Sequence, residues 1–482
     1  MPGRFFYFQD VVERQPASKI YKTCGSCLAN IKSHRRQKTI LNDRFISLIY
    51  IYFVRMYFLY IQEELNRAPG FRTCATTACL ALVAGCGGGG GGQATAGVPV
   101  PPPIALAVST PTSSTPTTAL SLTTTSTKST TSTTLSSTAS SCNFPDVQAV
   151  VNRSAAGATV SIPAGDCNWG VQQLIVPGGV SLKGVHVDVT TIRRVGPISE
   201  TSYLIAFDCS NGKPAILSGM TLVGNGDGAI QDNGLGLLRG CRDFKISDSK
   251  FTKFSQSAIY VGDAAGQRGV IYNNNFIDNY SADLKNFGYG VVVYGGGAWP
   301  DLELGSPNAV FVEDNYFSGN RHNIAANNGA VYVFRHNTVV GQGPARDYAM
   351  TDAHGLTTYW HGTRSYEIYD NDYSTNFAGP PQRTAVGIRG GDGVIFNNSA
   401  TATISRTIEL TAEGFVCGVY PGKDQIRSLY IWNNSANPGN GYTTNGIDNG
   451  CPSSIGLDRD YFLFKKPDYT PYTYPHPLRS VL

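Results

Sequence analysis

Charge is scarce in this sequence of 482 residues: charged side chains make up 15% of it, and the formal net charge is only +4. Downstream of Cys142 there is no run of Lys and Arg interleaved with aromatic residues, so we do not expect a nucleic acid partner. Long amphipathic patterns with the helical period are also scarce in that region, which argues against a mainly helical fold.

The region downstream of Cys142 is instead rich in short apolar runs interrupted by Gly and Asn, a pattern that is typical of all-β proteins. The total length alone would suggest two or three domains. We favour one elongated domain, because a solenoid can absorb several hundred residues by adding coils.

The cysteines predict disulfides rather than a metal site. Cys24 and Cys27 form a C-x-x-C pair, but zinc needs two further ligands nearby, so no metal is assigned there. Six cysteines lie from Cys142 onward, an even number that suits three disulfides in an exported protein. Sequence proximity favours one pairing among the fifteen that six cysteines allow, with buried free thiols as the alternative. The favoured pairs are Cys142–Cys167, Cys209–Cys241 and Cys417–Cys451.

Residues 73–86 read TCATTACLALVAGC, an apolar stretch that ends in small residues and Cys86 and follows Arg67 and Arg72. This segment resembles a bacterial lipobox, which implies that Cys86 is lipidated and becomes the first residue of the mature protein. Six glycines, 87–92, follow it as a flexible tether. The alternative is an ordinary signal peptide that is cleaved without lipidation.

Cys86 lies too far from Met1 for a signal peptide that begins there. We therefore interpret residues 1–72 as a leader that includes an extension upstream of the true start, with translation beginning near Met56. The alternative is that the apolar segment Phe45–Ile61, interrupted only by Arg55, crosses a membrane.

The stretch from Ala94 to Ser141 is first rich in Pro and then almost entirely Ser and Thr, so it cannot form a packed core. We predict a disordered linker over residues 87–141 and a folded domain over 142–482. The protein is expected in the bacterial cell envelope, as an outer-membrane or cell-surface lipoprotein, or outside the cell. A lipid on Cys86 would be its one contact with the membrane.

One pattern recurs in the folded region: apolar, any residue, apolar, then a polar pair that often contains Asn. The spacing varies from 22 residues (Asn315 to Asn337) to 41 (Asn274 to Asn315), so loops of different length must interrupt the repeat. Asn tolerates the left-handed backbone of a tight bend, and stacked Asn amides can hydrogen-bond along an axis. The candidate ladder consists of Asn274, Asn315, Asn337, Asn371, Asn398 and Asn434.

The helix-like stretch Asp146–Arg153 before these repeats, and the closing segment from Asp460 to Leu478, resemble the ends of proteins of the pectate-lyase-like superfamily. The resemblance implies an all-β fold, a single-stranded right-handed parallel β-helix (a solenoid) with an N-terminal helical cap. It also implies that the Asn bend joins the second and third strands of each coil, and that the sheet of first strands carries a substrate groove. The first strands are then expected at 258–261, 290–294, 323–326, 355–359, 385–388 and 407–410.

Alignment of these strands on Ile324, Leu356, Val386 and Ile408 places His322 and His354 on adjacent coils, which stack about 4.8 Å apart. Most histidines after residue 300 cluster near this edge, together with charged and aromatic residues. The candidate catalytic residues are His354, His322, Asp352, Arg321 and Arg389. The candidate substrate-binding residues are His361, Arg364, Trp360, Tyr359, Asp392 and Glu409. The alternative is that these residues serve turns, ion pairs and loop packing.

Two enzyme chemistries fit these residue types, and lyase chemistry is preferred. A lyase acting on an acidic polysaccharide needs a base, here His354 or His322, and a cation such as Arg321, Arg364 or Arg389 to neutralise the uronate. A Ca²⁺ ion could supply that charge, although no Asp cluster for it is recognised. A glycoside hydrolase needs two carboxyl groups, and Asp352 with Asp392 or with Glu409 are the candidate pairs.

The competing class is a non-catalytic surface protein that binds glycans. A polysaccharide is the expected partner in either class, and the protein is expected to be a monomer, with a trimer as the alternative. The specific motifs of pectate and alginate lyases are not recognised, so the resemblance supports the architecture and leaves the catalytic residues as hypotheses.

Overall fold

A computed structural model describes residues 136–480, except for 197, 199–201, 227–230, 263, 283–286, 344–348, 357–358, 377–383, 402–403 and 436–444. The predicted leader, the lipidation site at Cys86 and most of the predicted linker lie outside the described residues. Within the described ranges, no helix is long and apolar enough to cross a membrane. The alternative membrane segment Phe45–Ile61 is also outside them.

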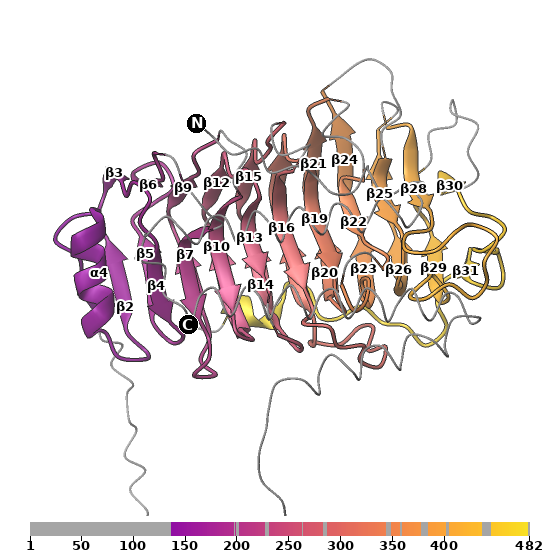
Figure 1. Cartoon of the computed structure of the whole chain (residues 1–482), viewed down its shortest axis with the longest axis horizontal. Helices are drawn as coiled ribbons and strands as arrows, with labels where there is room; N and C mark the ends of the chain where they lie inside the picture. The colour runs from indigo at the N-terminus through magenta and orange to yellow at the C-terminus, as the bar shows by residue number, and fades with distance from the viewer. Residues whose placement is uncertain are drawn as a thin grey trace, which may run out of the picture. The chain divides into compact units, whose positions relative to one another are not determined.

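The chain winds through three sheets in turn, and all their strands pair in parallel with the equivalent strands of the neighbouring coils (Figure 1). Sheet A consists of β1 (Ser136–Thr138), β2 (Thr159–Ile162), β5 (Ser181–Gly184), β8 (Ile216–Ser218), β11 (Arg242–Ser247), β14 (Arg268–Tyr272), β17 (Val310–Glu313), β20 (Val331–Arg335), β23 (Ser365–Tyr369), β26 (Asp392–Phe396), β29 (Leu429–Trp432) and β31 (Tyr461–Phe462). Sheet B consists of β3 (Gly165–Asn168), β6 (Thr190–Arg193), β9 (Thr221–Val223), β12 (Lys250–Thr252), β15 (Asn275–Ile277), β18 (Tyr316–Ser318), β21 (Thr338–Gly341), β24 (Asp372–Thr375) and β27 (Ser399–Ala400).

Sheet C contains the strands that the sequence analysis expected to carry the groove. It consists of β4 (Leu174–Pro177), β7 (Ser202–Asp208), β10 (Asp232–Leu238), β13 (Ser257–Val261), β16 (Tyr289–Tyr294), β19 (His322–Asn327), β22 (Thr351–Ala353), β25 (Thr384–Ile388), β28 (Arg406–Leu410) and β30 (Ile447–Asn449). Each coil passes from sheet A through B to C, so the predicted parallel β-helix is confirmed.

The first coil is covered by helix α4 (Phe144–Arg153), which begins two residues before the predicted start because Pro145 can occupy the first turn. Its apolar side, including Val147 and Val150, is buried against the coil, and Phe144 meets the edge of Trp169. Because the cap removes these apolar side chains from water, the end of the solenoid is closed.

The ordered coil begins slightly before the predicted boundary at Cys142. Strand β1 lies within the stretch that was assigned to the linker, and Ser136–Thr138 pair in register with Thr159–Ser161 of β2. The reason is that β2 would otherwise present an unpaired edge, and three Ser and Thr residues suffice to satisfy its backbone groups. The three predicted disulfides are all present, joining Cys142–Cys167, Cys209–Cys241 and Cys417–Cys451.

The predicted Asn ladder runs along the axis at the bend between sheets A and B. Each Asn side chain donates to the Oδ1 atom of the equivalent Asn in the next coil, as Asn315 does to Asn337 at 3.1 Å and Asn337 to Asn371 at 3.0 Å. The same amide groups also donate to backbone carbonyls, such as that of Val312. Six positions from Asn274 to Asn434 take part, so the irregular sequence spacings correspond to one straight line of bends.

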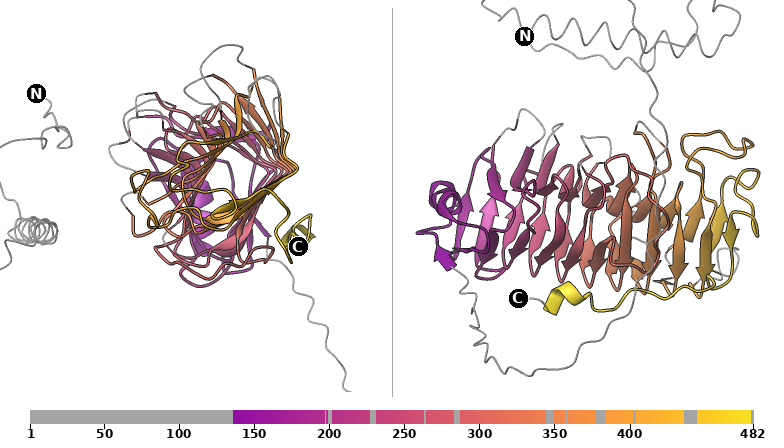
Figure 2. Two further views of the ribbon diagram at one scale, coloured as in Figure 1. Left: turned by 90° about the vertical axis from the view of Figure 1, so that its right-hand side faces the viewer. Right: turned by 90° about the horizontal axis from the view of Figure 1, so that it is seen from below.

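The outer face of sheet A is covered by the C-terminal segment, which runs back along the solenoid and ends in a short 3₁₀ helix, η3 (Pro477–Ser480) (Figure 2). Under it, Arg335 binds Glu313 in a fully buried ion pair and donates to the carbonyls of Tyr472 and Thr473. Sheet A is therefore closed to a ligand along this segment.

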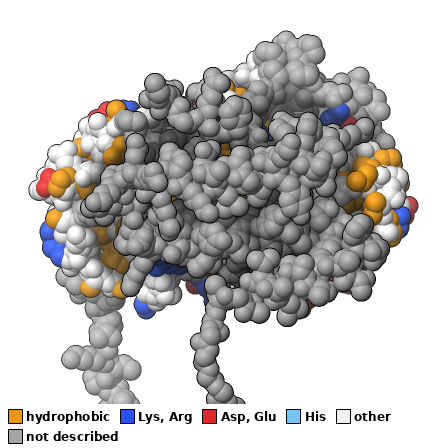
Figure 3. Space-filling view, viewed as in Figure 1, with side chains coloured by type: hydrophobic (Ala, Val, Ile, Leu, Met, Phe, Trp, Pro, Cys, Tyr) orange, Lys and Arg blue, Asp and Glu red, His pale blue; other side chains and the backbone are white. Residues whose placement is uncertain are grey.

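The described surface matches the low charge of the sequence. In the space-filling view, the visible described atoms are mostly hydrophobic or uncharged, with single cationic and acidic side chains among them (Figure 3).

One expected first strand is wrong. The structure places β22 at Thr351–Ala353, whereas residues 355–359 were expected to form it. The lumen at this coil already holds the large rings of Tyr332 and Tyr373, so the small side chains of Thr351 and Ala353 fit inward, and Tyr373 hydrogen-bonds to Thr351. Asp352 between them points outward as a consequence of the strand alternation.

The ladder predicts a position-specific loss of stability. We expect Asn337→Ala to lower the free energy of unfolding by about 3 kcal/mol, because it leaves the Asn315 amide and several carbonyls buried without partners. The control is Asn308→Ala, which removes an exposed contact to Glu303 and should cost less than about 0.5 kcal/mol. Urea denaturation measures both, and equal costs would contradict the structural role of the ladder.

Candidate functional site

A row of outward-facing positions crosses sheet C, one on each coil. Asp352 of β22 is in register with Ala325 of β19 on one side and Gly387 of β25 on the other. The row continues to Glu409 of β28 and Asp448 of β30. Because both immediate neighbours are small, charged groups from the adjoining loops can reach the Asp352 carboxylate.

Asp352 is fully buried and is held by three side chains. Arg389, which follows β25, donates from Nη2 to Oδ2 at 2.5 Å and from Nε to Oδ1 at 3.2 Å. His354, just beyond β22, places Nε2 at 2.9 Å from Oδ2, and His322 Nε2 lies 3.7 Å from the same atom. The two imidazole rings are 6.5 Å apart.

The predicted proximity of His322 and His354 is therefore present, although the expected alignment is not. His322 is in register with Tyr289, and the backbone of His354 bonds to Ala326, one position past the end of β22. Asp352 is what brings the two imidazoles together.

These contacts shift the pKa values of Asp352 and His354 in opposite directions. Burial raises the pKa of Asp352, but the positive charge of Arg389 and the charge and hydrogen bond of His354 outweigh it and hold that pKa well below its usual range. Burial lowers the pKa of His354, but Asp352 and Glu413 outweigh this and raise it above the ordinary value of 6.5. The site thus pairs an ionised Asp with a histidine that keeps its proton to higher pH than an ordinary imidazole does.

His322 is in the opposite state. Complete burial lowers its pKa to about 3, so the ring is neutral at physiological pH. Its Nδ1 atom lies 2.5 Å from the carbonyl of Ala349 and must be the donor, since a carbonyl only accepts. Nε2 then carries a lone pair and has no hydrogen-bond partner among the described residues. A buried polar atom left unpaired is uncommon and favours a functional explanation.

Glu413 completes the cluster from the loop between β28 and β29. Its carboxylate accepts from Arg389 Nη1 at 2.6 Å and from the backbone amide of Gly355 at 2.9 Å. Glu413 Oε2, the oxygen that accepts from Gly355, lies 3.2 Å from His354 Nδ1. This is an ion-pair distance without the alignment of a hydrogen bond. His354 therefore sits between two carboxylates, each of which also binds Arg389.

A groove with a volume of about 400 Å³ lies on the outer face of sheet C and reaches His354. Its walls are rich in tyrosine, and ring pairs follow one another along the axis: Tyr203 with Tyr260 at 5.7 Å and Tyr260 with Tyr294 at 5.5 Å. Tyr203 lies flat on the sheet because Gly236 has no side chain; a Cβ there would meet the ring at 2.8 Å. Tyr289 and Tyr359 also line the groove.

Arg321 lies beside Tyr289, which lines the groove. Its guanidinium lies over the ring of Tyr289 at 6.0 Å, and among the described residues it forms no ion pair. Arg389, by contrast, is committed to two carboxylates. Of the predicted cations, Arg321 is thus the one without a carboxylate partner in the described part of the chain.

Two predicted substrate-binding residues lie elsewhere. Arg364 donates to Asp392 at 2.9 Å and to the carbonyl of Pro300 at 2.6 Å, while Asp392 also accepts from the amide of Ser428. This pair stands at the start of sheet A strands, so Asp392 and Asp352 do not share a face. The expected carboxylate pair Asp352–Asp392 is wrong, because the turn before β26 directs Asp392 to the loop at 427–428.

The remaining predicted residues flank the cluster. His361 is paired with Asp424 at 3.0 Å and stacks on Trp299. The ring of Tyr359 lies against that of Tyr294, and Trp360 is 80% exposed. Glu409 accepts from Thr384 at 3.0 Å and pairs with Arg406 at 3.3 Å. It stands two coils from Asp352 on the same row, about 10 Å away by the spacing of parallel strands.

Of the tyrosines that line the groove, only Tyr359 was an expected site residue, and neither Glu413 nor Asp424 was among the candidates. Alternating outward tyrosines on successive first strands, as at Tyr260 and Tyr294, were a usable signal. Glu413 and Asp424 come from a long loop without periodicity and have no comparable signal. Within the described part of the chain, no group of three or more His, Cys, Asp or Glu side chains is arranged to hold a metal ion.

The charge of Asp352 should control the proton of His354. We expect Asp352→Asn to lower the pKa of His354, because it removes the largest attraction for the imidazolium. Asp370→Asn, at a bend away from sheet C, should leave that pKa unchanged. NMR titration of the histidine ring nitrogens measures both variants, and a wild-type His354 that titrates below 6.5 would refute this electrostatic account.

Comparison of the sequence with protein families and with curated proteins gives no match. Among solved structures, similarity is found to ORF18 of Geobacillus virus E2, with a TM-score of 0.38, 12% identity, and coverage of 63% of this chain and 56% of that one. The A-module of mannuronan C-5 epimerase AlgE4 from Azotobacter vinelandii has a TM-score of 0.32 at 15% identity, covering 68% of this chain and 95% of that one. The catalytic domain of a GH87 α-1,3-glucanase in complex with nigerose has a TM-score of 0.33 at 11% identity, with coverage of 69% and 68%.

Proposed function

We propose that this chain is a carbohydrate-active enzyme that binds a long acidic polysaccharide along sheet C and cleaves it by β-elimination next to His354. The observation that carries the proposal is the groove itself: a tyrosine-lined channel on the open sheet that ends at a buried cluster of Asp, His and Arg. Perturbed ionisable groups in a groove are the usual mark of a catalytic site.

The groove suits an extended sugar chain. Tyrosine offers a flat apolar face for the C–H groups of a pyranose and a hydroxyl for its polar edge. From Tyr260 to Asp352 the row advances by three coils, or about 14 Å at the spacing of parallel strands. A ligand that follows this row must be long and unbranched over several sugar units.

The cluster suits proton transfer. In β-elimination, a base takes the proton next to the uronate carboxyl group, the bond to the leaving glycosidic oxygen breaks, and a carbon–carbon double bond forms while the leaving oxygen takes up a proton. The neutral imidazole of His354 is the proposed base, and Arg321 is placed to neutralise the uronate. Because the pKa of His354 is raised, the fraction of neutral imidazole grows only as the pH rises through that pKa.

A hydrolase is less well supported by the same geometry. Inverting and retaining hydrolases need one carboxyl group that carries a proton. The low pKa of Asp352 keeps it ionised, so it cannot be that acid. Asp352 instead has the environment of a group that orients His354 and stabilises its protonated form.

We further propose that the protein acts outside the cytoplasm, attached through Cys86 and the linker of residues 87–141. The three disulfides support an oxidising location.

The lyase proposal predicts an unsaturated product. Incubation with a panel of uronate polysaccharides should release chains that absorb in the ultraviolet through the new double bond, at a rate that increases with pH. His354→Ala should reduce kcat by about 100-fold or more, in the range that general acid–base catalysis supplies. New reducing ends without that absorbance would show hydrolysis, and binding without any cleavage would show a glycan-binding protein; either result contradicts elimination.

The groove predicts a different effect for tyrosine. Tyr260→Ala should raise KM about fivefold with little change in kcat, since a lost stacking contact of about 1 kcal/mol acts mainly on binding. The matched control is Tyr316→Ala, an exposed tyrosine on β18 of sheet B, for which KM should stay at the wild-type value. Equal effects of the two substitutions would place the ligand away from sheet C.

A further inference from the structure

The loop of residues 411–428 joins β28 to β29 and touches the site at two points. Near its start, Glu413 contacts His354, Arg389 and the amide of Gly355. Near its end, Asp424 contacts His361 at 3.0 Å and the amide of Gly362 at 3.1 Å. The two acids therefore hold the two ends of the segment from His354 to Gly362.

The fit of the loop is close. At Gly414, which has a φ of +82°, a Cβ would stand 2.0 Å from the carbonyl oxygen of Leu356. At Gly390, a Cβ would meet the carbonyl oxygen of Asp424 at 2.5 Å. The loop backbone thus packs directly against the chain at Leu356 and at Gly390. Its position determines where the Glu413 carboxylate lies.

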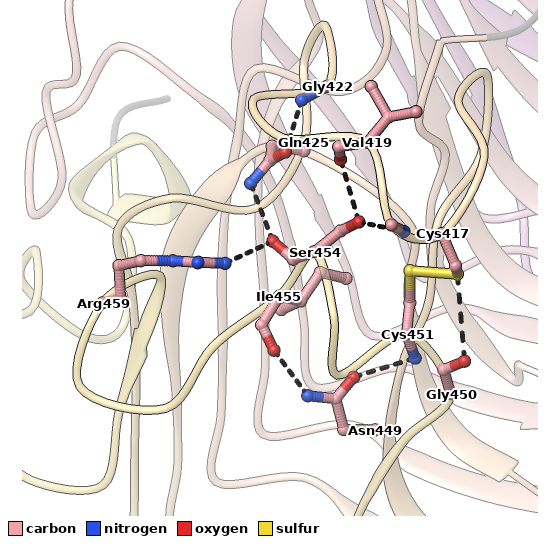
Figure 4. Close-up of a disulfide and its surroundings, with 11 residues drawn as sticks. Cys417, Val419, Gly422, Gln425, Asn449, Gly450, Cys451, Ser454, Ile455 and Arg459 are labelled. Atoms are coloured by element: carbon pink, nitrogen blue, oxygen red, sulfur yellow. Dashed lines mark hydrogen bonds between the residues drawn. A yellow bond between two sulfur atoms is a disulfide. The ribbon is translucent and has the colours of Figure 1, made fainter.

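The middle of the loop is fastened to the last coil rather than to the site. Cys417 forms a disulfide with Cys451, and the Ser454 hydroxyl accepts from the amide of Gly418 while donating to the carbonyl of Val419 (Figure 4). Gln425 donates to the carbonyl of Ser454 at 3.2 Å. The disulfide is the covalent part of this attachment.

We propose that the loop 411–428 is a brace, fastened by Cys417–Cys451, and that Glu413 is a positioning residue that the brace holds against His354. The inference rests on the proposed function, and it adds to it a residue and a covalent restraint. It explains why the loop carries a disulfide to the last coil while its two acids contact the histidines of the site.

The charged surroundings of His354 determine the sign of the effect. Asp352 from β22 and Glu413 from the loop favour its protonated form, whereas burial and the charge of Arg389 after β25 oppose it. If Glu413 is removed or moves away, less negative charge offsets the positive charge of Arg389 near the His354 imidazole. His354 then loses its proton at lower pH.

The first test is Glu413→Gln, which keeps the shape of the side chain and removes its charge. NMR titration should show a lower pKa for His354 than in the wild type, and the pH profile of kcat/KM should have its inflection at correspondingly lower pH. The plateau at high pH should fall on the order of tenfold, because the imidazole is less well oriented. Glu303→Gln, an exposed acid that contacts Asn308, should match the wild type in all three measurements.

The second test is the double variant Cys417→Ser with Cys451→Ser, in the full chain. It should reproduce the shifts of Glu413→Gln in both titration and pH profile. Its control is Cys209→Ser with Cys241→Ser, which removes the disulfide between β7 and β11 and should leave the His354 titration unchanged. Both double variants lose a disulfide, so a general loss of stability would affect them alike.

The outcomes separate the two proposals. An unchanged His354 pKa in Glu413→Gln or in the Cys417/Cys451 variant overturns the brace, whether or not the chain cleaves any polysaccharide. If the pKa of His354 is lowered in both variants but the wild-type protein cleaves no uronate polymer, the brace is supported and the lyase proposal is overturned.

Discussion

The structure depends on one constraint: successive coils stack in register, with their bends joined by a line of Asn amides. Each coil alone has an apolar side that it cannot bury, and stacking closes the lumen while pairing the backbone groups of all three sheets. Because the ladder holds the bends from Asn274 to Asn434 on one axis, an outward residue of sheet C stands directly above its equivalents in the neighbouring coils. This is how residues as distant in sequence as Tyr260 and Asp352 come to share one straight row.

Two of the buried ion clusters among the described residues show how similar side chains can have different roles. Arg335 and Glu313 lie beneath the C-terminal segment, where the guanidinium also donates to two backbone carbonyls, and they attach that segment to sheet A. Asp352 and Arg389 lie on the open sheet, beside a histidine with an unpaired nitrogen and at the end of a groove. Burying charge is costly, so a buried cluster at the end of a groove, beside an unpaired histidine nitrogen, favours a role in chemistry.

The sequence allowed the repeat to be recognised because its signals are local. Asn at a tight bend, cysteines close in the chain, and the apolar alternation of single strands all report on their own neighbourhood, and from these the fold, the ladder and the disulfide pairs were predicted. The expectation that His322 and His354 are neighbours combined coil stacking with the first strands that the superfamily resemblance implied.

What could not be predicted depends on contacts between distant segments. Strand β22 begins at Thr351 because Tyr332 and Tyr373 of other strands already fill the lumen, and alignment on Leu356 could not include their volume. Glu413 reaches the site from a loop whose course is determined by its attachment to Cys451 and Ser454, and loop sequences have no period from which such a course can be read.

The central claim is that the outer face of sheet C is where a sugar chain binds. The most direct measurement is a crystal structure of residues 136–482 with a bound uronate oligosaccharide. The account predicts sugar rings stacked on Tyr260 and Tyr294, with a carboxylate within reach of Arg321 and one ring beside His354. A ligand seated on sheet A or sheet B, with the tyrosines of sheet C uncovered, would contradict it.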